Sequence, residues 1–269
     1  MTSFILRAED RGHQTLRSDG SRASYLAGHP DGFVTRASSF NFNQYQSGRP
    51  GFGPMRVFGD EVFRGNGVGY NMHPHHNFAI CAFVLSGQLT HINTAGGGMV
   101  DNLRAGDFYV FSAGSGGKHC ELSVTGEDTN IIYVWVIPDQ LYLPPSYHRA
   151  HFDYRKRRSQ VIELVGKADD ALPMPQDLRV SRLVGDAGQS FDYALKAPGH
   201  GAYVFLLEGS ARVAGETLGR RDSLGAWDVA SFAVEPLEDE TDLLIVETAM
   251  IDDARAMEWE KAHADHDDH

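Results

Sequence analysis

One pattern limits the fold of this chain more than any other: two short strand-like runs meet at a glycine. This pattern occurs in both halves of the chain. In the first half, residues 78–92 form two such runs around Gly87. In the second half, residues 202–213 repeat the layout around Gly209. Runs rich in branched and aromatic residues on either side of a glycine turn are typical of a β-hairpin. The recurrence predicts an all-β protein with a weak internal duplication.

A proline-rich segment separates the two halves. Three prolines lie between Pro138 and Pro145, and they interrupt any sheet at that point. A length of 269 residues also favours two domains over one. We therefore expect an N-terminal barrel, a linker, a C-terminal barrel and a short helical tail, with bounds of 1–140, 141–158, 159–250 and 251–269.

Charge and cysteine content exclude several classes of function. Asp and Glu number 36 against 24 Lys and Arg, and the resulting net charge of -12 disfavours direct binding to nucleic acid or to a membrane surface. No run approaches the roughly 18 apolar residues of a membrane span. Two cysteines are too few for a disulfide framework and favour a reducing compartment. We expect a cytoplasmic protein, as a monomer or a weak dimer.

Two histidine-containing motifs predict a metal site. In an extended strand, residues two apart share a face, so His73 and His75 direct two imidazoles to one side. His119 and Glu121 repeat the spacing, and Cys120 between them faces away. A single His-x-His among 13 histidines can be a surface loop. The second pair favours a site for a divalent transition metal, with nitrogen and oxygen ligands.

Around these motifs the sequence resembles the pirin family over about its first 155 residues. Gly225–Asp228 extends the likeness weakly into the second half. The matching segments are Arg11–His13, Gly51–Gly53, Met55–Val57, His73–His75, Phe83–Gly87, His91, Gly106–Asp107, Ser112–Gly116, His119–Glu121 and Val134–Pro138. The resemblance implies a bicupin of two antiparallel β-barrels, of jelly-roll type. It further implies a non-haem iron in the N-terminal barrel, held by His73, His75, His119 and Glu121.

The chain departs from the family pattern at two places. A Glu that pirins usually carry four residues after the second motif histidine is replaced by Ala79. In the pirin version the counterpart of Glu121 takes over as ligand, so the site is expected to survive. The region 15–46 is expanded, and we expect a lid or an altered pocket mouth there.

The second half lacks the ligands of the first. Residues 201–262 contain no histidine, and the positions equivalent to His73 and His75 are Leu195 and Ala197. The C-terminal barrel is therefore predicted to be structural or an interaction surface.

Several other residues carry weaker signals. His76 follows the ligand pair and is expected to point away from the site, while His91 is equally consistent with a pocket residue and a half-exposed one. Gly96–Gly98 is predicted to be a flexible turn, because no Lys-Ser/Thr and no helix follows it. The histidines at 263, 266 and 269 are expected to lie in a solvated tail.

The resemblance implies two alternative functions. The first is a dioxygenase that cleaves a flavonol such as quercetin at Fe(II), with Glu121 as the catalytic residue that accepts the substrate proton. The second is a non-enzymatic, iron-dependent redox sensor that acts through a regulatory protein partner. Iron is the metal that the family implies, but nickel, manganese, copper and zinc suit nearly the same ligands.

Overall fold

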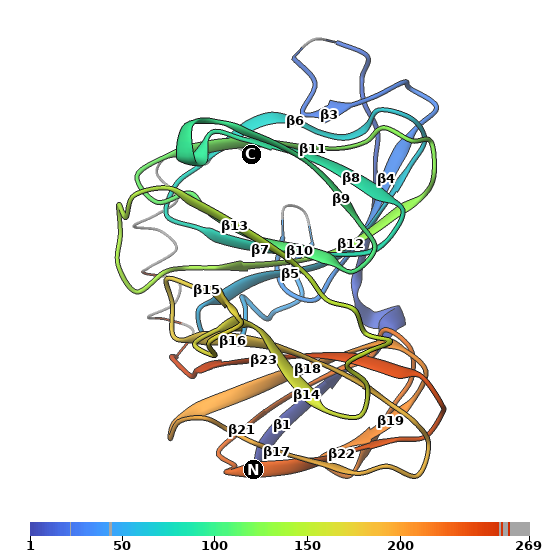
Figure 1. The fold of residues 1–269 in the computed structure, drawn as a ribbon, viewed down its shortest axis with the longest axis vertical. Helices are drawn as coiled ribbons and strands as arrows, with labels where there is room; N and C mark the ends of the chain where they lie inside the picture. Colours follow the sequence, from blue (N-terminus) through green and yellow to red (C-terminus); the bar gives the residue numbers. More distant parts are fainter. Residues whose placement is uncertain (22, 43–44, 253, 255–257, 259–269) are drawn as a thin grey trace. The chain divides into compact units, whose positions relative to one another are not determined.

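The computed structural model describes residues 1–21, 23–42, 45–252, 254 and 258 and is built almost wholly of β-strands (Figure 1). The all-β prediction is therefore confirmed. Ala254 and Glu258 are helical, and the rest of the expected helical stretch lies outside the described residues. Within the described part of the chain, no helix is long and apolar enough to cross a membrane.

The chain divides into two compact units. The first, here called the histidine unit, comprises Gly12–Gly51 and Met55–Phe152. The second, here called the C-terminal unit, comprises Met1–Arg11, Phe52–Pro54 and Asp153–Asp253.

The histidine unit consists of two antiparallel sheets. One has the order β13-β10-β7-β12-β5-β4-β2 and the other the order β3-β6-β11-β8-β9. The strands are β2 (Gly12–Leu16), β3 (Leu26–Ala27), β4 (Phe33–Ser38), β5 (Met55–Arg64), β6 (Val68–His75), β7 (Ala79–Ser86), β8 (Gln88–Asn93), β9 (Met99–Arg104), β10 (Asp107–Ser112), β11 (Gly117–Ser123), β12 (Thr129–Val136) and β13 (Ser146–His151), with a 3-10 turn η2 (Ala95–Gly97) between β8 and β9.

The core of the histidine unit lies between these sheets. It joins Val34, Phe63 and Ile80 of the larger sheet with Val68 and Leu89 of the smaller one, all almost fully buried. Strands such as β4 and β8 alternate between half-buried and buried positions, as expected where one face of a sheet packs on a core. The buried positions are therefore the ones that direct side chains between the sheets.

The C-terminal unit also consists of two sheets. Their orders are β1-β21-β18-β23-β16-β14-β15 and β17-β22-β19-β20. The elements are β1 (Thr2–Leu6), η1 (Ala8–Asp10), β14 (Val161–Gly166), β15 (Leu172–Pro173), β16 (Leu178–Gly185), β17 (Phe191–Ala194), β18 (His200–Glu208), β19 (Ala211–Val213), β20 (Glu216–Leu218), β21 (Ser223–Trp227), β22 (Ser231–Pro236) and β23 (Thr241–Ala249).

The predicted duplication appears in the strand order. The run β10-β7-β12-β5 of one unit corresponds to β21-β18-β23-β16 of the other, and β6-β11-β8-β9 corresponds to β17-β22-β19-β20. Gly87 and Gly209 both adopt positive φ angles, of 73° and 81°, at equivalent turns. A β-carbon on Gly87 would lie 2.6 Å from the Asp128 carbonyl oxygen, so this turn requires glycine.

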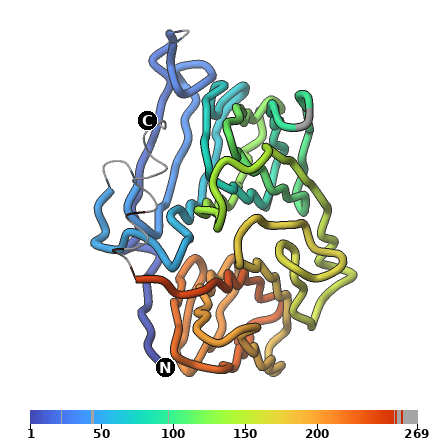
Figure 2. The backbone as a smooth tube through the Cα atoms, turned by 90° about the vertical axis from the view of Figure 1, so that its left-hand side faces the viewer, coloured from blue at the N-terminus to red at the C-terminus, as the bar shows by residue number. Residues whose placement is uncertain are grey.

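The structure differs from the expected organisation in three respects. Each unit is a pair of open sheets in a jelly-roll-like arrangement and not a closed barrel. The first eleven residues belong to the C-terminal unit, because β1 pairs along its length with β21 (Figure 2). Residues 146–151, expected in the linker, form β13 and pair with β10. The prolines before β13 end one strand but leave the next segment able to pair.

A buried carboxylate holds together several segments of the C-terminal unit. Glu247 on β23 is fully buried and accepts hydrogen bonds from the Tyr193 hydroxyl at 2.8 Å and the Lys196 amide at 2.7 Å. The ring of His200 bonds to the same carboxylate, with 2.8 Å between Nδ1 and Oε1. Glu247 is therefore the point where β17, β18 and β23 are joined.

We expect Glu247→Leu to destabilise the protein by about 3–5 kcal/mol, because it leaves without an acceptor the buried donors that had shared this carboxylate. Glu247→Gln keeps an acceptor and should lose much less. Urea unfolding of both variants measures the difference. A leucine variant as stable as wild type would show that this carboxylate does not hold the unit together.

Candidate metal centre

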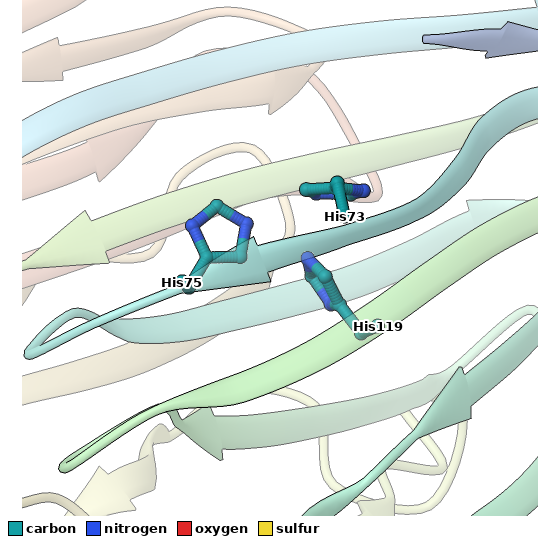
Figure 3. A group of neighbouring side chains, drawn as sticks. All are labelled: His73, His75 and His119. Carbon is teal, nitrogen blue, oxygen red and sulfur yellow. The ribbon is translucent and has the colours of Figure 1, made fainter. Parts of the chain in front are cut away.

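Three buried imidazoles converge between the sheets of the histidine unit (Figure 3). β6 and β11 pair antiparallel, and their register places His119 directly opposite His73. The ring centroids of His73 and His119 are 4.5 Å apart, and that of His75 is 4.8 Å from each of the other two. Their ligand nitrogens all lie within 4.8 Å of one another. The structure thus brings together the three histidines predicted by strand parity.

A glycine allows the two ligand strands to approach each other. Gly69 on β6 has a φ angle of +149°, and a β-carbon there would lie 1.9 Å from the carbonyl oxygen of Glu121 on β11. The β6–β11 register shifts by one residue between His119 and Glu121, which marks a β-bulge. Close backbone contact and the bulge together determine where the ligand side chains lie.

A hydrogen bond defines which nitrogen His73 directs to the centre. Nδ1 of His73 lies 2.7 Å from the carbonyl oxygen of Asn71, which can only accept, so Nδ1 carries the proton. In the neutral ring Nε2 then holds the lone pair that a metal needs. Nδ1 of His119 lies 3.1 Å from Nε2 of His91.

Glu121 lies beside the histidines, but its nearest partner is a tyrosine. The Tyr109 hydroxyl donates to Oε1 of Glu121 at 2.5 Å, and Nδ1 of His119 is 3.7 Å from the same oxygen. Burial raises the pKa of the Glu121 carboxyl to about 8, and the hydrogen bond from Tyr109 only partly offsets this. Glu121 groups with His91 and His119 and not with His73 and His75. Its role as fourth ligand therefore stays a prediction.

The donor set fits a divalent transition metal. Imidazole nitrogens with a carboxylate suit iron, nickel, copper or zinc, whereas calcium and magnesium require mainly oxygen. His73, His75 and His119 are almost fully buried, so an ion held between them would be shielded from bulk water. These residues are able to hold one ion between β6 and β11.

A small pocket opens onto this centre. Its walls include His73 and Glu121 together with aromatic side chains, and the lining consists of Tyr25, Arg36, Glu61, Tyr70, His73, Glu121, Tyr133 and Trp135. Tyr25 and Arg36, both within the region 15–46, line this pocket, and a lid or an altered mouth there stays a prediction.

A buried ion pair that the sequence motifs did not predict forms part of the cavity wall. Nε of Arg36 on β4 lies 2.9 Å from Oε1 of Glu61 on β5, and Tyr70 donates to Oε2 of Glu61 at 2.7 Å. Burial raises the pKa of Glu61, against the opposing effect of Arg36. The sequence did contain a signal that Arg36 points inward, because Arg36 lies two residues after the buried Val34 and so on the same face of the strand.

The remaining predicted residues fall outside the group of three histidines. His76 follows the end of β6 and, as expected, belongs to neither metal group. Cys120 is buried with a free thiol, and Ala79 begins the buried strand β7. His91 is fully buried, which excludes the half-exposed alternative, but it is not among the residues that line the pocket. Burial, with a contribution from His73, lowers the pKa of His91 to about 3. The histidines at 263, 266 and 269 lie outside the described residues.

The C-terminal unit has apolar side chains where the histidine unit has its ligands. β22 corresponds to β11, and its inward residues are Phe232 and Val234. Tyr193 on β17, the counterpart of β6, packs with them. Both groups of metal-ligand type found among the described residues lie in the histidine unit. The degenerate second site predicted from the sequence is thus filled by hydrophobic core.

Comparisons with known proteins agree with this geometry. Residues 25–136 match the family model described as Pirin, and residues 166–248 match the Quercetinase C-terminal cupin domain. A pirin-like protein of Caulobacter vibrioides is 32% identical over 83% of this chain and 96% of its own. A quercetin 2,3-dioxygenase of Escherichia coli K12 is 25% identical over 90% of this chain and 96% of its own.

Among solved structures, the bacterial pirin YhhW from Escherichia coli, in complex with nickel(II), superposes with a TM-score of 0.79. It is 20% identical, and the match covers 93% of this chain and 100% of that one. The fold, the paired sheets and the matched family models agree across both units. The chain belongs to the pirin family.

Proposed function

We propose that this protein is a metal-dependent dioxygenase that cleaves a flavonol such as quercetin at an Fe(II) centre. The observation that carries the proposal is the aromatic-walled cavity that ends on His73 and Glu121. Tyr25, Tyr70 and Trp135 in its wall are side chains of the kind on which a flat, polyhydroxylated ligand packs. A relative that carries the name quercetin 2,3-dioxygenase supports the assignment.

The chain's own residues supply the acid–base chemistry. Bound Fe(II) would supply open coordination positions and a change of oxidation state, which oxygen chemistry requires. Glu121 is the group that can accept the proton of a flavonol hydroxyl. Tyr109 orients this carboxylate through its hydrogen bond, and burial of both groups excludes water.

A second candidate function is an iron-dependent redox sensor that acts through a protein partner. Two exposed apolar side chains close to the histidines favour it. Met72, next to His73 on β6, is 47% exposed, and Tyr25 at the cavity wall is 39% exposed. A partner that reads the state of the metal would contact residues of this kind.

Metal analysis followed by oxygen uptake tests the first function. Untagged protein should bind one ion per chain, since both metal-type groups share His119. With Fe(II) and quercetin it should consume oxygen, and flavone, which lacks the 3-hydroxyl, should give no uptake. Absence of quercetin-dependent uptake by fully loaded protein would contradict the dioxygenase and leave the sensor.

A further inference from the structure

His91 is a buried histidine outside both ligand motifs. It lies on β8, opposite Glu121 in the pairing of β8 with β11, and is fully buried. Its ring stacks on Tyr109 with centroids 4.3 Å apart, and on Tyr147 at 5.1 Å. These two flat contacts hold the plane of the imidazole, so each nitrogen is presented to a defined neighbour.

The neighbour of Nε2 is the metal ligand His119. Nε2 of His91 lies 3.1 Å from Nδ1 of His119, within hydrogen-bond distance. Glu121 is the other polar group close to Nδ1, but its Oε1 is 3.7 Å away and accepts the Tyr109 hydroxyl. This contact fits a hydrogen bond in either direction, and the form of His119 that binds a metal through Nε2 is the one in which Nδ1 donates to His91. Nδ2 of Asn93 is 3.5 Å from Nδ1 of His91, beyond the usual hydrogen-bond range, so Nδ1 of His91 is able to carry that ring's proton.

We propose that His91 is a positioning residue for His119: it accepts the Nδ1 proton and so fixes the tautomer and orientation in which Nε2 binds the ion. The inference rests on the metal centre of the proposed function. An imidazole that binds a metal through Nε2 carries its proton on Nδ1, and ligating histidines almost always donate that proton to an acceptor. In this chain the acceptor is a second imidazole.

The alternative is that His91 binds metal directly, because His91, His119 and Glu121 also lie close enough to form a group of ligands. The two roles make different demands on the side chain. A direct ligand requires the imidazole nitrogen. A positioning residue requires only an acceptor at the place of Nε2, which the amide oxygen of glutamine can supply.

Two substitutions distinguish these roles. His91→Leu removes the acceptor, and its nickel dissociation constant, measured by competitive chelation, should rise about 10- to 100-fold. His91→Gln keeps an acceptor and should bind nickel within a few-fold of wild type. His148 on β13 is exposed, so His148→Leu is the matched control and should bind normally. The melting temperature of each metal-free variant shows that the fold is retained.

A spectroscopic measurement reports on the hydrogen bond itself. In cobalt-loaded protein, proton NMR should show shifted, exchangeable N–H signals from the ligating imidazoles. The signal of the His119 Nδ1 proton should be present in wild type and His91→Gln, and should move or vanish in His91→Leu. The Nδ1 proton of His73, bonded to the Asn71 carbonyl oxygen at 2.7 Å, should be unchanged and is the internal reference.

The outcomes separate this inference from the proposed function. Nickel affinity equal to wild type in His91→Leu would overturn the inference, and so would equal losses in the leucine and glutamine variants. The expected pattern in a protein that takes up no oxygen would support the inference and contradict the dioxygenase. A wild-type protein that binds neither nickel nor iron would overturn both.

Discussion

Replacing Glu121 with alanine is expected to weaken iron binding by at least 10- to 100-fold and to abolish any oxygenase activity. Loss of a residue that only supports a ligand commonly costs that much affinity, so loss of a ligand should cost no less. Ala79 supplies no oxygen, and Glu121 is the carboxylate that lies beside His119. The fold should be retained, because the core is formed by apolar residues of both sheets, although the Tyr109 hydroxyl loses its buried acceptor and the variant should be less stable.

His76→Ala is the matched control for this experiment. His76 lies beyond the end of β6 and outside both metal groups, so the variant should bind iron normally. Competitive chelation gives the affinity of both variants, and oxygen uptake gives their activity. Equal affinities for Glu121→Ala and wild type would show that the fourth ligand is wrongly assigned.

The second large effect is expected in stability. Arg36→Leu should lower the free energy of unfolding by about 3–5 kcal/mol, because it leaves Glu61 as a buried carboxylate without its cation. The side chains of Arg36 and Glu61 are only 4% and 1% exposed, so water cannot replace the lost partner. Urea unfolding measures the change.

Two further variants show whether the missing charge is the cause. Adding Glu61→Gln to Arg36→Leu removes the carboxylate and keeps an acceptor for the Tyr70 hydroxyl, so most of the stability should return. Arg64→Leu breaks the exposed pair of Arg64 with Asp128 and should cost less than about 1 kcal/mol. If Arg36→Leu costs no more than Arg64→Leu, the buried pair does not stabilise the unit.

The three histidines could be predicted because their arrangement follows from local rules. Strand parity places His73 and His75 on one face, and β6 pairs with the strand that carries His119. The same rule would have found His91, which is in phase with the buried Leu89 on β8. A polar residue in phase with core positions is a signal for a buried functional group.

Other features depend on contacts that no local pattern reveals. The alternation in Phe33–Ser38 marks Arg36 as inward, but only the β4–β5 register places it opposite Glu61. The prolines before β13 correctly indicate a break, yet the return of that segment to the edge of β10 depends on pairing over a long separation. The partner of β1 is likewise far away in sequence.

The position of β1 has a consequence for the order in which the molecule can form during translation. β1 (Thr2–Leu6) leaves the ribosome long before its partner β21 (Ser223–Trp227). The large sheet of the C-terminal unit can therefore be completed only after β21 has been synthesised. Until then Phe4, Ile5 and Leu6 remain an unpaired apolar strand, available to chaperones or to other nascent chains.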